Sequence, residues 1–157
     1  MPAPATYSRL QKLLHWLTAL VILAQFVFPD AIGAAWRAFR QGTQIAPDPM
    51  VIAHIAGGVA VLALALWRLA LRARHGVPAA QGSALVARAA HWGHVALSAV
   101  MVLTAASGAT AWFGGITAAG EAHEVLKTVL LLLIAGHVVM ALWHQFVLRD
   151  GTLARMR

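Results

Sequence analysis

Histidine is the residue type in this sequence with the greatest capacity for chemistry. The chain has eight His and no Cys among its 157 residues, which excludes disulfides, thiolate metal sites, iron–sulfur clusters and haem attached covalently through Cys. Seven of the eight His lie within or at the ends of apolar stretches: His15, His54, His91, His94, His123, His137 and His144. Ionisable side chains are costly inside apolar helices and are usually functional. One such His could simply bond to a neighbouring helix, but seven favour sites for a metal or cofactor.

The spacing of two of these His indicates which cofactor they could bind. His123 and His137 are 14 residues apart. This is close to the ~14.4 residues of four helical turns, so the two would share one helix face about 21 Å apart. Ligands that far apart serve two centres at different depths. Neutral imidazole is a common axial ligand of haem iron, whereas zinc needs about four converging ligands. The pattern therefore favours two planar cofactors over a zinc site.

Small and cationic residues near the His are further candidates for cofactor contacts. Gly57 lies one turn from His54, where a missing side chain lets the backbone approach a flat ring. Taken alone, such a glycine is better explained by close packing of membrane helices. Arg68, Arg9 and Lys127 lie where they could pair with the propionate groups of a haem, although snorkelling toward the membrane surface is an equal explanation.

Four long apolar stretches must position these residues. The chain is 61% apolar and 11% charged, with a mean hydropathy of +0.74, against about 45–50% and 25% in soluble domains. This composition excludes a soluble globular domain and a disordered chain. Helices are predicted over about 10–30, 50–71, 89–113 and 122–148, close to the ~20 residues that cross a bilayer. Polar turns are predicted at 30–49, 72–88 and 114–121. The sequence thus predicts an all-α, four-transmembrane-helix bundle as a single domain over residues 1–157.

The distribution of cationic residues predicts the orientation of the bundle. Nine Lys and Arg lie at the two termini and around the connection between the second and third helices, and three lie on the other side. The positive-inside rule then places both termini in the cytoplasm. The net charge of +7 is explained by this topology, so a nucleic-acid partner is not predicted. Most of the six Trp lie near the ends of the stretches, as in an interfacial belt.

With these residues in view, the sequence resembles the bacterial cytochrome b561 family, which includes the cytochrome b subunits of nickel–iron hydrogenases. The resemblance covers nearly the whole chain, and its four motifs occur in the family's order. The matching segments are Tyr7-Ser8-Arg9-Leu10-Gln11 with His15-Trp16, Ile52-Ala53-His54 with Gly57, His91-Trp92-Gly93-His94, His123-Glu124 through His137 to Trp143-His144, and Leu148-Arg149-Asp150-Gly151-Thr152-Leu153.

The resemblance implies a bundle in the bacterial inner membrane that binds two b-type haems, each through two His. By this resemblance, His15 and His137 hold the haem toward the cytoplasm, and His54 and His123 hold the haem toward the periplasm. Depth along the helices alone would pair His15 with His144, whereas the resemblance and the four-turn spacing favour His137.

Several other residues receive expected roles from this arrangement. Gly57 and Arg68 are expected to contact the cofactors. His144, with Arg9, becomes the candidate for a quinone site on the cytoplasmic side. His91 and His94 are expected to lie beside a haem or its propionates.

The function that the resemblance implies is electron transfer across the membrane. Haem iron with both axial positions filled by His has no open position for oxygen chemistry and passes single electrons. Family members that stand alone are understood to oxidise superoxide and reduce ubiquinone, and Arg37, Arg40 and Lys127 are available to attract the anion. The short loops favour this stand-alone type. Two alternatives are a cytochrome subunit that docks a soluble dehydrogenase or hydrogenase, and a non-redox carrier lined by His.

Overall fold

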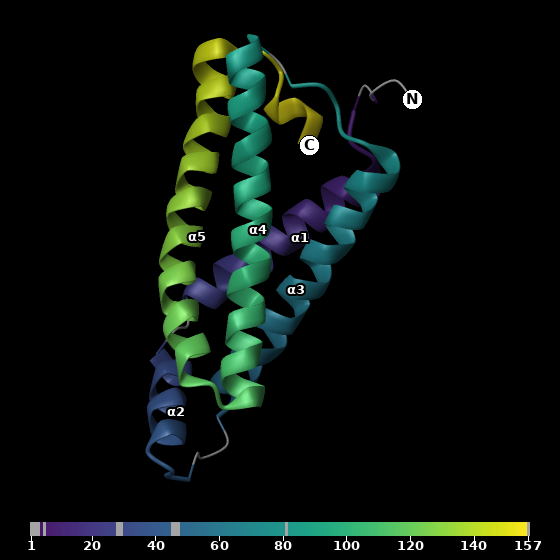
Figure 1. Cartoon of the computed structure of the whole chain (residues 1–157). Coiled ribbons are helices and arrows are strands. Elements are labelled where there is room, and N and C mark those ends of the chain that lie inside the picture. Colours follow the sequence, from purple (N-terminus) through teal and green to yellow (C-terminus); the bar gives the residue numbers. More distant parts are fainter. Residues whose placement is uncertain (1–3, 5, 28–29, 45–47, 81, 157) are drawn as a thin grey trace.

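The described part of the chain is almost entirely helical (Figure 1). The computed structural model describes all residues except 1–3, 5, 28–29, 45–47, 81 and 157. The helices are α1 (Arg9–Val27), α2 (Asp30–Arg40), α3 (Pro49–His75), α4 (Ala84–Gly114) and α5 (Thr117–Trp143). A π-helical turn (His144–Leu148) continues α5, and a 3₁₀ turn (Leu153–Met156) follows it.

Four of these helices are long and apolar enough to cross a membrane. They are α1, α3, α4 and α5 together with its π-helical turn. Large apolar side chains on their surfaces are widely exposed, including Leu13 at 63%, Val125 at 65% and Leu132 at 68%. Such a surface is unfavourable in water, but lipid tails solvate it, and helices satisfy their backbone polar groups internally. The four long apolar helices confirm the predicted all-α architecture of a four-span bundle.

Local signals explain where α3 and α4 begin and end. The Asp48 side chain accepts a hydrogen bond from the Met50 N–H (2.7 Å) at the start of α3, and Gly76 ends that helix with a positive φ of 69°. Ser83 caps the start of α4, and Gly115 ends it in the left-handed conformation. Side-chain acceptors at N-caps and glycine after the last turn are the preferred helix boundaries. The short connection at Gly115 makes α4 and α5 antiparallel neighbours.

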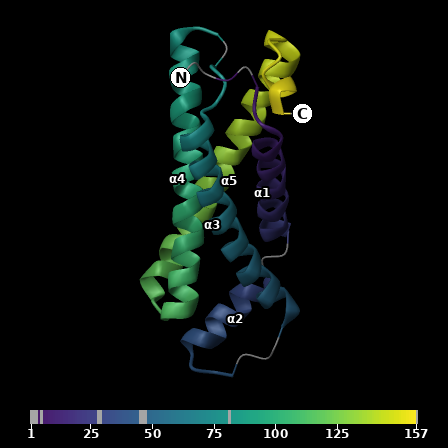
Figure 2. The same ribbon diagram turned by 90° about the vertical axis from the view of Figure 1, so that its right-hand side faces the viewer.

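Packing within the bundle runs from helix to helix as a series. α1 packs on α3, α3 on α4, and α4 along α5. A small buried core of Val61, Ala65, Met101 and Leu130 lies where α3, α4 and α5 meet. By contrast, the backbones of α1 and α5 come close to each other at few points. Figure 2 shows the start of α1 and the end of α5 at the same end of the bundle.

Several predicted boundaries need correction, including the start of the last span, which lies at Thr117 and not at 122. The segment after the first span was predicted as polar turns, but residues 30–40 form the helix α2. Its apolar residues Ile32, Trp36 and Phe39 recur at helical spacing, which is the pattern of a short amphipathic helix. The predicted spans 50–71 and 89–113 were too short, because α3 continues through the arginines to His75 and α4 begins at Ala84. Arginine is a good helix former, so charge ends the apolar run without ending the helix.

Candidate functional site

Two pairs of His face each other at different depths in the bundle. The ring centroids of His15 on α1 and His137 on α5 are 6.3 Å apart, and those of His54 on α3 and His123 on α5 are 6.4 Å apart. A metal–nitrogen distance of about 2.0–2.1 Å and a ring radius of about 1.1 Å place two imidazoles on opposite sides of one iron with centroids about 6.3 Å apart. Both pairs therefore have the spacing of two axial ligands of one metal.

The His15–His137 pair is distinguished from its neighbours by this spacing. The ring of His94 is 5.4 Å from that of His137, which is too close for two ligands on opposite sides of one iron. His144 contacts Asp150 instead of His15. The structure thus brings His15 together with His137, rather than with the alternative that depth alone suggested.

Around the His54–His123 pair the structure has a cavity of about 600 Å³ that is lined by residues from all five helices. His123 Nδ1 lies 2.8 Å from the Thr104 carbonyl oxygen. Because a carbonyl only accepts, Nδ1 carries the proton and donates it, which leaves Nε2 with the lone pair that binds a metal. His54 Nδ1 is buried and has no hydrogen-bond partner among the residues that the structure describes.

Gly108 lets α4 lie close to this site. A Cβ atom at this position would be 2.9 Å from Cε1 and Nδ1 of His123, closer than real side chains approach. Gly108 and Gly58 both line the cavity. The two imidazoles, the oriented Nδ1 of His123 and the glycine-lined space together fit a planar group held by two His.

The predicted contact residue Gly57 lies in a different environment from Gly58. A Cβ atom on Gly57 would be 2.7 Å from the Gln25 carboxamide oxygen on α1. The Gln25 amide in turn donates to the His54 carbonyl oxygen (2.8 Å). Gly57 therefore accommodates a side chain that joins α1 to α3 at His54, and its contact with a cofactor stays a prediction. Gln25 and Thr104 were not among the predicted site residues, although a carboxamide inside an apolar helix was a usable signal.

Arg68 lies beside the His15–His137 pair. One terminal nitrogen of its guanidinium is 3.2 Å from His15 Nδ1. In the part of the chain that the structure describes, Arg68 forms no ion pair with a carboxylate. A cation within a membrane span needs a partner, so Arg68 is suited to an anionic group bound next to His15.

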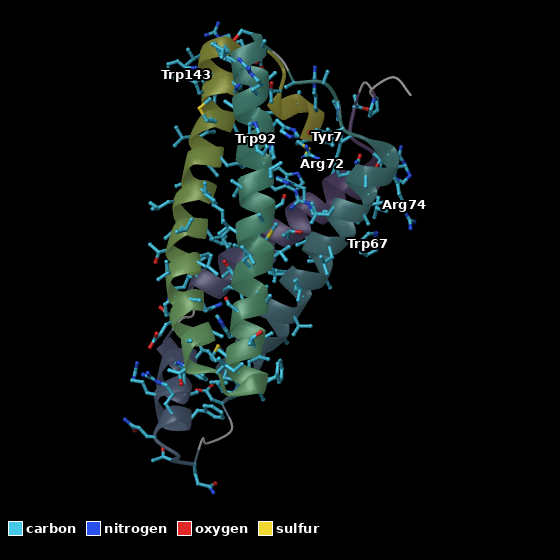
Figure 3. All side chains as sticks on the ribbon, viewed as in Figure 1. Tyr7, Trp67, Arg72, Arg74, Trp92 and Trp143 are labelled. Atoms are coloured by element: carbon cyan, nitrogen blue, oxygen red, sulfur yellow. The ribbon has the colours of Figure 1, made fainter. Side chains whose placement is uncertain are left out.

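His91 and His144, which belong to neither pair, also have polar neighbours. His91 Nδ1 lies 3.5 Å from Arg72, which is on the side of α3 facing the bundle, whereas Arg74 points away from it (Figure 3). His144 Nδ1 lies 2.5 Å from Asp150 Oδ2. Hydrogen bonds from Thr152 and His144 lower the pKa of the Asp150 carboxyl to about 2, so this carboxylate is charged at neutral pH.

The predicted quinone site at His144 and Arg9 stays a prediction. Arg9 is exposed, and no contact within the described residues joins it to His144. Nor do three or more His, Asp or Glu of the described residues converge on one point, as a zinc site requires. The arrangement supports two separate two-ligand centres.

Comparison with known proteins identifies the family. The sequence model for prokaryotic cytochrome b561 matches residues 6–157. Of the curated relatives, the cytochrome b562 of Cereibacter sphaeroides is 36% identical over 150 residues, which cover 96% of this chain and 94% of the relative. A Yersinia pestis protein named probable superoxide oxidase CybB is 27% identical over 173 aligned residues, with the same coverage. These matches confirm the resemblance seen in the histidine motifs, and the chain belongs to the prokaryotic cytochrome b561 family.

Proposed function

We propose that this protein is a superoxide:ubiquinone oxidoreductase, which takes electrons at the periplasmic face and delivers them to ubiquinone in the membrane. Di-haem electron transfer is the function of its family. The observation that carries the proposal is the presence of two imidazole pairs with axial-ligand spacing, joined through His123 and His137 on the single helix α5. A chain with two such centres at different depths can move electrons across the bilayer.

In this proposal His15 and His137 hold one haem b, and His54 and His123 hold the other. A bound haem would supply single-electron transfer. The four His would hold the two haems at different depths in the bundle. Thr104 fixes the orientation of the His123 ring, and Gln25 fixes α1 against α3 at His54. Arg68 would bind a haem propionate next to His15.

The electrostatics at the α2 end support an anionic electron donor. Arg37 and Arg40 of α2 line the cavity of the His54–His123 pair. Lys127 also lines it, but it forms a 2.6 Å ion pair with Glu124 that offsets its charge. Positive charge around a cleft raises the local concentration of an anion and its association rate. The two arginines therefore favour a small anion such as superoxide, and the name of the Yersinia relative agrees with this substrate.

Proteoliposomes test this proposal directly. Purified protein with both haems bound is reconstituted with ubiquinone, and superoxide is generated outside the vesicles. We expect reduced ubiquinone to accumulate at a rate that depends on the protein. Failure of superoxide to reduce ubiquinone while both haems are present would contradict the proposed substrate.

A second candidate function is a cytochrome b that accepts electrons from another protein. The relative with 36% identity is named a cytochrome and not an oxidase. Co-purification of a soluble dehydrogenase with the native protein, together with inactivity toward superoxide, would favour this function. The short connections of the bundle, such as the one at Gly115, offer little surface for such a partner.

Neutralising the two arginines of α2 is expected to slow the reaction with superoxide. The Arg37→Gln/Arg40→Gln double variant should lose about tenfold in kcat/KM and most of its dependence on salt, because steering of an anion is lost. The matched control is Arg74→Gln, which removes a charge that faces away from the bundle. Initial rates measured at several ionic strengths give the comparison. Equal rates and equal salt dependence in the double variant and in Arg74→Gln would refute steering of the anion by α2.

Adding a methyl group at Gly108 is expected to damage the His54–His123 site selectively. In Gly108→Ala the new Cβ would lie 2.9 Å from the His123 ring, so the ring must move. We expect about tenfold weaker binding of that haem, since displacing the groups that orient a ligand typically has this effect. Gly93→Ala is the control on the same helix, because a Cβ there meets no atom of the described residues within 4 Å. Haem titration of the two variants measures the difference, and identical titrations would contradict the role of Gly108.

A further inference from the structure

The chain beyond α5 folds back as a compact hook, defined here as residues Arg149–Met156. Arg149 has a φ of 51° and Gly151 a φ of 74°, so the backbone passes twice through the left-handed region and reverses direction. The 3₁₀ turn Leu153–Met156 then lies beside the start of α1 in both views (Figures 1 and 2). The hook therefore extends from the end of α5 toward α1.

Polar contacts hold the hook at both of its ends. At its beginning, Asp150 bonds to His144 Nδ1 of the π-helical turn (2.5 Å) and accepts from the Thr152 N–H (3.0 Å). At its far end, the indole N–H of Trp16 on α1 donates to the Met156 carbonyl oxygen (2.8 Å). These contacts connect the π-helical turn to α1 through the hook.

A third contact joins the hook to the connection between α3 and α4. Arg155 donates to the Ala79 carbonyl oxygen (2.7 Å). The Gln11 side chain of α1 donates to the Gly76 carbonyl oxygen of the same connection (3.0 Å). The first turns of α1 are thus fastened to two segments that lie outside the apolar spans.

The location of these contacts matters because α1 and α5 carry His15 and His137. α1 packs on α3, and α5 packs on α4, whereas the backbones of α1 and α5 come close to each other at few points. Contacts at the ends of these two helices therefore help to fix the distance between them. The Trp16 ring contacts the neighbouring His15 ring edge-on, with centroids 5.2 Å apart. The hydrogen bond from Trp16 to Met156 therefore restrains the residue that directly follows the proposed ligand His15.

We propose that the hook is a clasp that sets the separation of His15 and His137, with Trp16 and Asp150 as its positioning residues. The consequence for a bound haem rests on the proposed function, because it assumes that these His are its ligands. The clasp itself concerns only the relation between α1 and α5. The two statements can therefore be tested separately.

The first test measures the separation of the helices without haem. The chain contains no Cys, so cysteines introduced at Leu13 on α1 and Val139 on α5 can carry spin labels; both side chains are more than 60% exposed. In haem-free protein we expect one narrow distance distribution. Trp16→Phe, which keeps a ring but loses the N–H donor, and Asp150→Asn should broaden it. Trp67→Phe is the control, since Trp67 is a half-exposed residue on α3 that lies away from the hook (Figure 3).

The second test compares the two haem centres in the same variants. In Trp16→Phe and Asp150→Asn we expect about tenfold weaker binding of the haem at His15 and His137, with a broadened low-spin resonance, as loss of groups that orient ligands produces. The haem at His54 and His123 should be unchanged. Unchanged label distances in both variants, or equal changes at both haem centres, would overturn the clasp. If His15→Ala keeps both haems while the label distances still broaden, the ligand assignment fails and the clasp stands.

Discussion

His54→Ala and His123→Ala are each expected to lower the haem content from two per chain to one, and to remove the same haem. The two rings have the separation of axial ligands on one iron, with centroids 6.4 Å apart. Removing either ring would leave the iron with a single protein ligand. The low-spin centre would then be lost, and the haem would be held too weakly to stay bound. Haem extracted per chain, together with low-temperature spectra of the reduced protein, measures the loss.

Comparing the haem content of the single and double variants shows whether the two His bind the same iron or whether each substitution simply disturbs the fold. Because the two His act on one centre, the double variant should lose no more haem than either single variant. His91→Ala is the control, since His91 contacts Trp92 and Arg72 but neither member of the pair. Loss of different haems in the two single variants would contradict ligation of one iron by this pair.

His15→Ala and His137→Ala are expected to remove the other haem and to abolish electron transfer across the membrane. Their rings are 6.3 Å apart, and one centre alone cannot connect the two faces of the bilayer. The informative comparison is His144→Ala, which removes the partner of Asp150 and not a proposed ligand. It should weaken binding of this haem by about tenfold, as Asp150→Asn does, without abolishing it. Spectra and quinone reduction in vesicles give both readouts. Loss of a haem in His144→Ala, with retention in His137→Ala, would support the pairing by depth instead.

The four spans could be predicted from the sequence because composition and length alone define them. The helix α2 was missed because residues 30–49 were predicted as one polar segment of turns, although Ile32, Trp36 and Phe39 recur with the 3.6-residue period of a helix. The charged ends of α3 and α4 were missed for a related reason. Apolar runs report where lipid solvates the chain, whereas helices continue through the interface.

The residues that could serve as ligands were accessible from the sequence, but most of their surroundings were not. Helical spacing places His123 and His137 on one face and at two depths without any knowledge of their neighbours. The contacts of Gln25 with His54 and of Thr104 with His123 depend on how α1 meets α3 and how α4 meets α5. Periodicity within one helix carries no information on such pairings. The pairing of His144 with Asp150 likewise depends on the reversal at Arg149.

Haem content and coordination in the purified, unmodified protein test the central claim most directly. A pyridine haemochrome assay, combined with reduced-minus-oxidised and electron paramagnetic resonance spectra, gives the haem type, the number per chain and the axial ligands. The account predicts two haems b per chain, both low-spin with two imidazole ligands. A colourless protein, a single haem per chain, or a high-spin centre with an open axial position would contradict it.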